Sequence, residues 1–302
     1  MAAFAGLWMG FGGRRFAVAL VIAAVLFGFE LFLAVPGVLK LAQLTLRIPG
    51  VLFAPLVPLF AVLVYSFAVS GDLKLMLAGA AYAVLPALLL ARSAGKSPGT
   101  WEDYAAAIMI WLPVEFRWTY RIFPYPPPLT HVLTILMALS TGVAAFVLLR
   151  RLEGVGYAIE WRRGFAAIVG LYFIVFAAIA IPIGIRMHFL VFAPSLRLDH
   201  FLPLSALGIL FFTAWPEEFL FRGILQNLLS RTMKNEWAGL GITSVIFGFS
   251  HIFHAPYPNW KYVLLATLAG LFYGHVWMRT RSLVPGTIVH ALVDISWHIL
   301  FR

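Results

Sequence analysis

Apolar runs about as long as a bilayer is thick recur along this chain and constrain its fold more than any other feature. The first extends from about Phe16 to Val35 and follows Arg14 and Arg15. Its roughly 20 residues suffice for a helix to cross the hydrocarbon core, and they exceed the roughly 7 to 15 residues of a signal-peptide core. We therefore expect a retained membrane anchor here.

Eight further runs have the same character and are expected to form spans. They cover approximately residues 51–69, 75–91, 129–149, 164–185, 202–229 with an interruption near Pro216, 237–254, 261–278 and 282–301. The sequence is 62% hydrophobic and 11% charged, whereas soluble domains carry about 25% charged residues. It therefore predicts an all-α polytopic membrane protein, a transmembrane helix bundle of about eight to nine spans.

The segment near 101–128 differs from these runs because aromatic residues are spread along it and three prolines follow. Such aromatic belts are typical of membrane surfaces, so we expect an interfacial or re-entrant segment. Four arginines in the loop 150–163 favour a cytoplasmic position for that loop. With nine spans, this orientation puts the N-terminus inside and the C-terminus outside.

The formal net charge of +10 comes mostly from arginines at the ends of apolar runs. Orientation in the membrane and contact with anionic lipid explain this pattern better than nucleic-acid binding does. We therefore expect membrane lipids as partners and no nucleic acid. The sequence has no cysteine, which excludes disulfides, thiolate metal sites and cysteine nucleophiles.

Two adjacent carboxylates and an arginine interrupt the apolar run 202–229. Glu218 and Arg222 are four residues apart, so on a helix they share a face and can pair. Glu217 is rotated about 100° away, and a carboxylate among apolar neighbours without a fixed partner suits a general base or acid. The alternative is a buried ionic cluster that merely ties helices together.

Two later runs carry histidines in pairs spaced by four residues. Phe247 and His251 share a helix face, and Gly248 allows close approach of another helix. His290 and Asp294 share a face of the last run, where an Asp costs roughly 2.5 to 3.5 kcal/mol to insert. Each pair alone also fits a structural hydrogen bond or a proton relay. If the three runs face one another, their polar groups form an intramembrane chamber suited to amide hydrolysis by water.

These motifs, in this order, resemble a known family. Glu217-Glu218-x3-Arg222, Phe247-x3-His251 and His290-x3-Asp294 are similar to motifs of the CPBP intramembrane proteases. That family is also called the CAAX protease and bacteriocin-processing or Abi family, and it includes the CAAX prenyl endopeptidases. The resemblance covers roughly residues 165–302 and implies a CAAX prenyl protease 2-like catalytic bundle over 161–302, preceded by N-terminal transmembrane helices over 1–160.

The resemblance also implies the roles of the site residues. The catalytic residues would be Glu217, Glu218, Arg222, His251, His290 and Asp294, with Phe247 in support. Glu217 and His251 would activate water, and His290 with the residue at 294 would stabilise the oxyanion. The CAAX prenyl endopeptidases have Asn at position 294. Because an ionised Asp donates no hydrogen bond, Asp294 would have to be protonated or serve to orient His290.

A divalent metal such as zinc is an open alternative as cofactor, with Glu217, His251 and His290 as candidate ligands. Such a site would make the protein a metalloprotease. The sequence lacks a His-Glu-x2-His motif, which disfavours a site-2-type zinc protease. It also lacks a Gly-x-Gly-Asp motif, which disfavours a presenilin-like aspartyl protease.

The expected function is cleavage of a membrane-associated, prenylated or leader-bearing protein or peptide. The expected location is the bacterial or archaeal cell membrane, with the chamber open to the cytoplasm. Two other functions stay open: a proton-coupled transporter that uses the same acids and histidines as a relay, and a non-catalytic membrane scaffold. The ordered triple motif favours the protease, because a relay does not require it.

Overall fold

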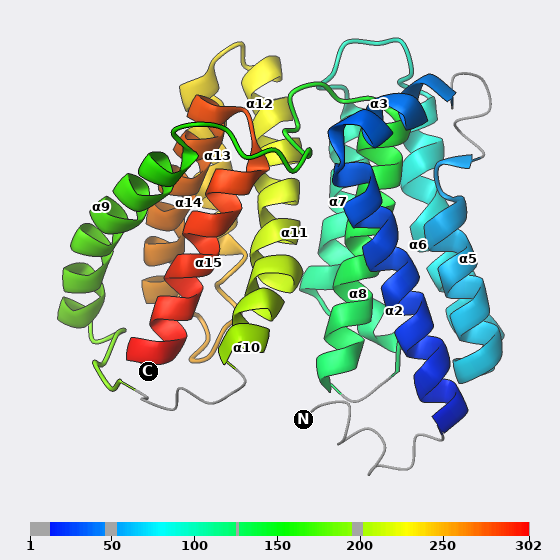
Figure 1. Ribbon diagram of the computed structural model, residues 1–302, viewed down its shortest axis with the longest axis horizontal. Helices are drawn as coiled ribbons and strands as arrows, with labels where there is room; N and C mark the ends of the chain where they lie inside the picture. Colours follow the sequence, from blue (N-terminus) through cyan, green and yellow to red (C-terminus); the bar gives the residue numbers. More distant parts are fainter. Residues whose placement is uncertain (1–12, 46–52, 125–126, 195–201, 302) are drawn as a thin grey trace. The chain divides into compact units, whose positions relative to one another are not determined.

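The computed structural model describes residues 13–45, 53–124, 127–194 and 202–301, and these fold into helices (Figure 1). Within these ranges the only β-type pairing is one isolated antiparallel bridge between Phe192 and Phe301. Six helices in the described residues are long and apolar enough to cross a membrane. The predicted all-α membrane helix bundle is confirmed.

The six long apolar helices agree with six predicted spans to within a few residues. They are Gly13–Ala34, Leu73–Ala91, Leu129–Leu149, Phe165–Arg186, Pro203–Thr232 and Leu283–Leu300. Two more predicted spans correspond to the shorter apolar helices Leu56–Ser70 and Glu236–Phe249. The remaining predicted span, 261–278, corresponds to α14 (Trp260–Thr280). This helix has 21 residues but is not among the six long apolar helices.

The chain divides into two compact units, Met1–Glu153 and Gly154–Arg302. The helices of the first are α2 (Gly13–Ala34), α3 (Pro36–Thr45), α5 (Leu56–Tyr65) with η1 (Ser66–Ser70), α6 (Leu73–Ala91), α7 (Trp101–Glu115), η2 (Trp118–Arg121) and α8 (Pro127–Gly142) with η3 (Val143–Leu149). Buried polar pairs hold this unit together. Ser140 donates to Glu30 at 2.8 Å, and Arg150 makes two hydrogen bonds to Asp103.

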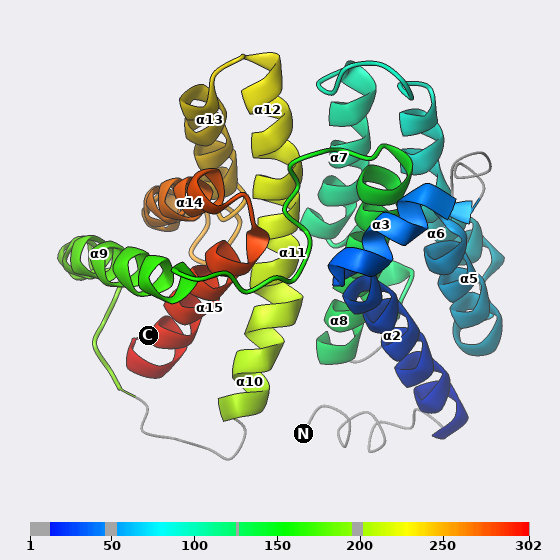
Figure 2. The same ribbon diagram turned by 45° about the horizontal axis from the view of Figure 1, so that its top comes forward.

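The second unit carries the three motifs. Its helices are α9 (Phe165–Arg186), α10 (Leu202–Ile209), η4 (Leu210–Ala214), α11 (Trp215–Glu218), η5 (Phe219–Gln226), α12 (Asn227–Thr232), α13 (Glu236–Phe249), α14 and α15 (Leu283–Leu300). Figure 2 shows α10 to α12 as one long rod, and α15 contacts both this rod and α14. The motif residues therefore come from elements that pack against one another.

The predicted interruption at Pro216 is wrong, because the rod continues through this residue. It does so with wider π-helical turns on both sides, η4 before the proline and η5 after the two glutamates. Proline lacks the N–H that an α-helical turn requires, and a wider turn accommodates that loss. Glu217 and Glu218 thus lie on a four-residue α-helical turn between two π-helical segments.

The end predicted for the span 237–254 is also wrong, since α13 stops at Phe249 and a turn follows. His251 lies in this turn, and its N–H bonds to the carbonyl of Gly248 at 3.0 Å. The close approach predicted at Gly248 is confirmed, because a Cβ atom there would lie 2.6 Å from the carbonyl oxygen of Val263 on α14. This packing fixes the end of α13, and with it the turn that carries His251.

Candidate active site

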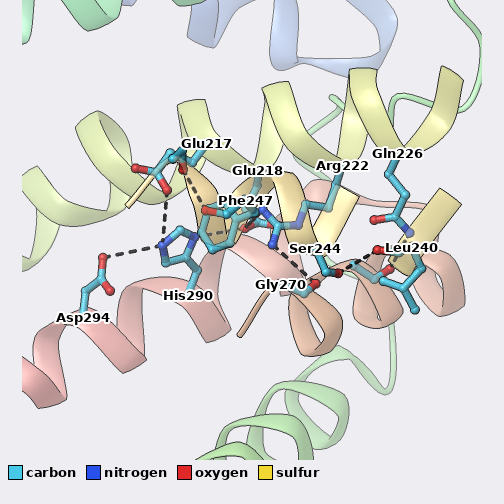
Figure 3. A network of polar contacts seen from close by, with 12 residues as sticks. Glu217, Glu218, Arg222, Gln226, Leu240, Ser244, Phe247, Gly270, His290 and Asp294 are labelled. Carbon is cyan, nitrogen blue, oxygen red and sulfur yellow. Dashed lines mark hydrogen bonds and ion pairs between the residues drawn. The ribbon is translucent and has the colours of Figure 1, made fainter. Parts of the chain in front are cut away.

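His290 on α15 is the centre of a cluster of charged side chains (Figure 3). Its Nδ1 atom lies 2.9 Å from Oε1 of Glu218, and its Nε2 atom lies 3.8 Å from Oε2 of Glu217 and 3.6 Å from Oδ2 of Asp294. The imidazole is buried, at 4% exposure. Three carboxylates from two helical elements therefore surround one ring.

Glu218 connects this histidine to Arg222. Nη1 of Arg222 lies 3.1 Å from Oε1 of Glu218, and both side chains are 1% exposed. The predicted pair is therefore confirmed, although its geometry is that of an ion pair without a well-formed hydrogen bond. The guanidinium also lies 4.4 Å from the centre of the Phe247 ring, within the range of a cation–π contact. Glu218 thus has a fixed charge partner, which an acid in an apolar interior requires.

Glu217 has no charge partner as close as Arg222 is to Glu218. Its side chain is about one-third exposed, yet its Oε2 atom is buried and lacks a hydrogen-bond partner among the described residues. The nearest cationic group is His290, at 3.8 Å. Oε2 of Glu217 is therefore a buried acceptor without a hydrogen bond, although other atoms of the same side chain are exposed.

His251 lies beside this cluster and has a defined tautomer. Its Nδ1 atom is 2.8 Å from the carbonyl oxygen of Phe247 and 3.1 Å from Oγ of Ser250, which itself donates to the same carbonyl. Because a carbonyl oxygen only accepts hydrogen bonds, Nδ1 carries the proton. In the neutral ring Nε2 is then an acceptor, which suits it to hold or deprotonate a water.

Aromatic rings fix the two histidines in place. Tyr273 of α14 stacks on His290 with centroids 4.6 Å apart, and Tyr262 lies 4.5 Å from His251. The Phe247 ring lies 4.9 Å from His251 and 5.8 Å from His290 and so bridges them. The supporting position predicted for Phe247 agrees with these contacts. The two tyrosines were missed, because a tyrosine in an apolar helix matches no motif.

An apolar cavity of about 300 Å³ adjoins the cluster. His251, His290 and Asp294 line it together with aromatic and aliphatic side chains of α9, α14 and α15. Glu217 does not line this cavity and approaches it only through its contact with His290. Asp294 also lines a second cavity of about 580 Å³, which includes Thr213, His254 and His298. The site thus adjoins two cavities, of which the first is apolar and the second is more polar.

The proposed zinc ligands do not form a metal centre in this geometry. Within the described residues, no group of three His, Asp or Glu side chains is arranged to hold a metal ion. Hydrogen bonds to Glu218 and to the carbonyl of Phe247 hold Nδ1 of His290 and Nδ1 of His251, so only Nε2 of each ring could bind a metal. The cluster instead resembles a charge network that orients one imidazole.

Two further polar residues on the described helices, His275 and Glu30, have contacts outside this cluster. Nδ1 of His275 on α14 lies 2.9 Å from the hydroxyl of Tyr172, within hydrogen-bond distance. Glu30 in the first unit accepts from Ser140. Neither therefore belongs to the candidate site.

Comparison with known proteins identifies a family match over the part of the chain that carries these residues. Residues 199–296 match the model of the Rce1-like family, described as type II CAAX prenyl endopeptidase Rce1-like. Searches of curated proteins and of solved structures found no match. The matched range includes every motif residue from Glu217 to Asp294. The predicted resemblance to the CAAX intramembrane proteases is thereby confirmed over residues 199–296. Together with the six long apolar helices, this match supports an integral membrane protein.

Proposed function

We propose that the protein hydrolyses a peptide bond of a membrane-associated substrate by means of a water activated by Glu217. The observation that carries this proposal is the convergence of Glu217, Glu218 and Asp294 on His290 at the edge of a cavity that His251 also lines. In a purely structural ion cluster we would expect every carboxylate oxygen to have a hydrogen-bond partner. Oε2 of Glu217 has none among the described residues.

The first step would be attack by water on the scissile carbonyl carbon. Glu217 accepts a proton from the water, and Nε2 of His251 holds the water by accepting its other hydrogen. The new carbon–oxygen bond converts the carbonyl into a tetrahedral oxyanion. Glu217 then passes its proton to the departing nitrogen, the oxyanion re-forms a carbonyl, and the carbon–nitrogen bond breaks. The products are a carboxylic acid and an amine, and transfer of the acid proton to the amine gives a carboxylate and an ammonium.

The oxyanion would be stabilised by His290. Its Nδ1 donates to Glu218, so a doubly protonated ring presents Nε2–H to the developing negative charge. Asp294, 3.6 Å from Nε2, supports this state as an anion that faces the imidazolium. In this chain Asp294 therefore acts by orienting and charging His290, whereas the Asn of the CAAX prenyl endopeptidases can donate directly.

Glu218 and Arg222 would keep this arrangement rigid in a dry environment. Their burial and pairing place a fixed acceptor behind His290. The apolar cavity beside the ring supports a substrate with an apolar segment or chain near the cleaved bond. A prenylated C-terminus, as named in the family description, or another apolar membrane-bound segment would satisfy this requirement. The bacterial or archaeal cell membrane and a cytoplasmic opening stay predictions.

The proposal is tested by trapping. We expect the full-length Glu217→Gln variant, solubilised from its own membranes, to retain a substrate that it does not cut. Mass spectrometry would then show a set of intact proteins with Glu217→Gln and their shorter products with wild type. The matched control is Glu236→Gln, which alters an exposed glutamate paired with Arg281 and should behave as wild type. Identical processing by wild type and Glu217→Gln would contradict the proposal.

A further inference from the structure

A groove in the first unit is lined by none of the motif residues. It runs between α6 and α7, has a volume of about 500 Å³, and is lined almost entirely by apolar side chains. Leu75, Ala78 and Leu85 of α6 form one wall, and Ile108 and Leu112 of α7 form the other. The turn that carries η2 closes one end. This groove has no counterpart among the sequence motifs.

The local sequence explains why the groove is open and rigid. Alanines at positions 78 and 81 leave space on the α6 face that looks toward α7. The hydroxyl of Tyr82 donates to the carbonyl of Ile110 at 2.8 Å and joins the two helices along the floor. From Leu75 to Pro86 the groove follows twelve residues of helix, a rise of about 16 Å at roughly 1.5 Å per step. That length is close to half of a hydrocarbon core about 30 Å thick.

A cationic group stands at the closed end of the groove. Arg121 lines the groove and is exposed, and no ion pair joins it to an acid in the described part of the chain. Trp118 lines the same end, is 59% exposed and stacks on Phe116 with centroids 5.5 Å apart. Exposed tryptophan next to arginine is typical of the level of lipid headgroups.

Positively charged side chains outnumber negatively charged ones around this end of the groove. Lys74 at the start of α6 and Arg117 beside Trp118 are also exposed. Two carboxylates lie in the same region, and both have hydrogen bonds of their own. Asp72 accepts from the backbone N–H groups that begin α6, and Glu115 accepts from the indole of Trp111 at 3.1 Å. Three cations therefore outnumber two anions in the sequence segments at this end of the groove, which favours an anionic ligand.

We infer that this groove binds one acyl chain of an anionic phospholipid, with its phosphate at Arg121. A peptide would need hydrogen-bond partners for its backbone in the groove. The groove offers few, because the hydroxyls of Tyr82 and Thr119 already donate to backbone carbonyls. A hydrocarbon chain needs no hydrogen-bond partners, and the groove is about as long as the hydrocarbon part of one leaflet is thick. The inference goes beyond the proteolytic function and concerns the unit that the family model does not cover.

Native mass spectrometry of the full chain tests this site with two lipids that differ only in headgroup charge. The delipidated protein receives equal amounts of palmitoyl-oleoyl phosphatidylglycerol and palmitoyl-oleoyl phosphatidylcholine. We expect wild type to retain mainly phosphatidylglycerol, and Arg121→Gln to lower that retention about fivefold, as loss of one basic contact to an anionic lipid implies. Ala78→Trp should fill the groove and lower retention of both lipids.

Two matched controls lie on the same helix outside the groove. Arg92→Gln removes an exposed arginine at the other end of α6, and Leu88→Trp adds a ring at an exposed position that does not line the groove. Both should bind lipid as wild type does. Retention unchanged by Arg121→Gln, or complete competition by free glycerol phosphate, would overturn the inference. If circular dichroism shows that Ala78→Trp does not fold, the comparison of Arg121→Gln with wild type still tests the inference.

Discussion

Nδ1 of His290 lies 2.9 Å from Oε1 of Glu218, although 72 residues separate the two in the chain. This contact joins α15 to α11 and determines which edge of the imidazole faces the cavity. Glu218 can serve as a permanent acceptor only because Arg222 shares its charge. The orientation of His290 therefore depends on a buried ion pair that does not itself contact the apolar cavity.

Arg222→Met should destabilise the protein strongly. Removal of one partner of a buried ion pair leaves the other charge uncompensated, which typically costs about 3–5 kcal/mol. Thermal unfolding in detergent measures this cost. The control is Arg162→Met, which breaks an exposed pair with Glu160 and should cost at most about 1 kcal/mol. Equal losses for both variants would contradict the structural role assigned to Arg222.

Tyr273→Leu should slow cleavage about tenfold and leave substrate binding nearly unchanged, because the ring that stacks on His290 is lost. Tyr273→Phe keeps the ring and should retain most of the activity. Steady-state kinetics separate the two effects as a fall in kcat without a rise in KM. An equal loss in both variants would show that the hydroxyl, not the stacking, matters.

Gly248→Ala should destabilise the α13–α14 contact by about 1–3 kcal/mol, the usual cost of overpacking. The added Cβ would meet both Thr267 and the carbonyl of Val263. It should also lower activity, because α13 leads directly into the turn that carries His251. Gly241→Ala on the same helix has nothing within 4 Å of its Cβ and should be neutral or stabilising by up to about 1 kcal/mol. Thermal unfolding that ranks the two variants in the opposite order would contradict this packing.

Asp103 should make the first unit sensitive to acid. Burial raises the pKa of its carboxyl, but hydrogen bonds from Arg150 and from the N–H groups of Gly99 and Thr100 outweigh burial and hold the pKa below its usual value. Its contribution to stability is therefore complete above its unfolded pKa of about 3.9 and is lost as pH falls through the lower folded pKa.

Asp103→Asn measures this contribution directly. At pH 7 the variant should unfold at a lower temperature than wild type, and the difference should shrink as the pH falls below about 4. Glu160→Gln, at an exposed pair, supplies the control. A difference that stays constant between pH 7 and pH 3 would contradict the account of Asp103.

The sequence predicted the helices and the charged side chains of the site because both depend on local spacing. Long apolar runs define spans, and residues four apart share a helix face, so the Glu218–Arg222 and His290–Asp294 contacts follow from the chain itself. The end of α13 was not predictable in this way, because Ile252 and Phe253 extend the apolar pattern past Phe249. His251 nevertheless contacts Phe247, since the turn continues roughly one helical turn.

Contacts between helices distant in sequence could not be predicted from spacing. Nothing local shows that Glu218 rather than Asp294 would hold Nδ1 of His290, or that Tyr273 would stack on its ring. Such contacts depend on how α11, α14 and α15 pack. The continuity of the helix through Pro216 was missed because wider π-helical turns leave no pattern in the sequence.

Single-turnover cleavage by Glu217→Gln tests the central claim most directly. The purified variant is incubated in liposomes with a substrate that wild type cuts, and product is followed beside wild type and Glu236→Gln. Loss of a general base predicts a rate lower by about 10²–10⁴-fold, with unchanged helicity and substrate retention. Cleavage by Glu217→Gln at the wild-type rate would contradict the claim, as would Glu217-dependent proton flux across the liposome without cleavage of any substrate.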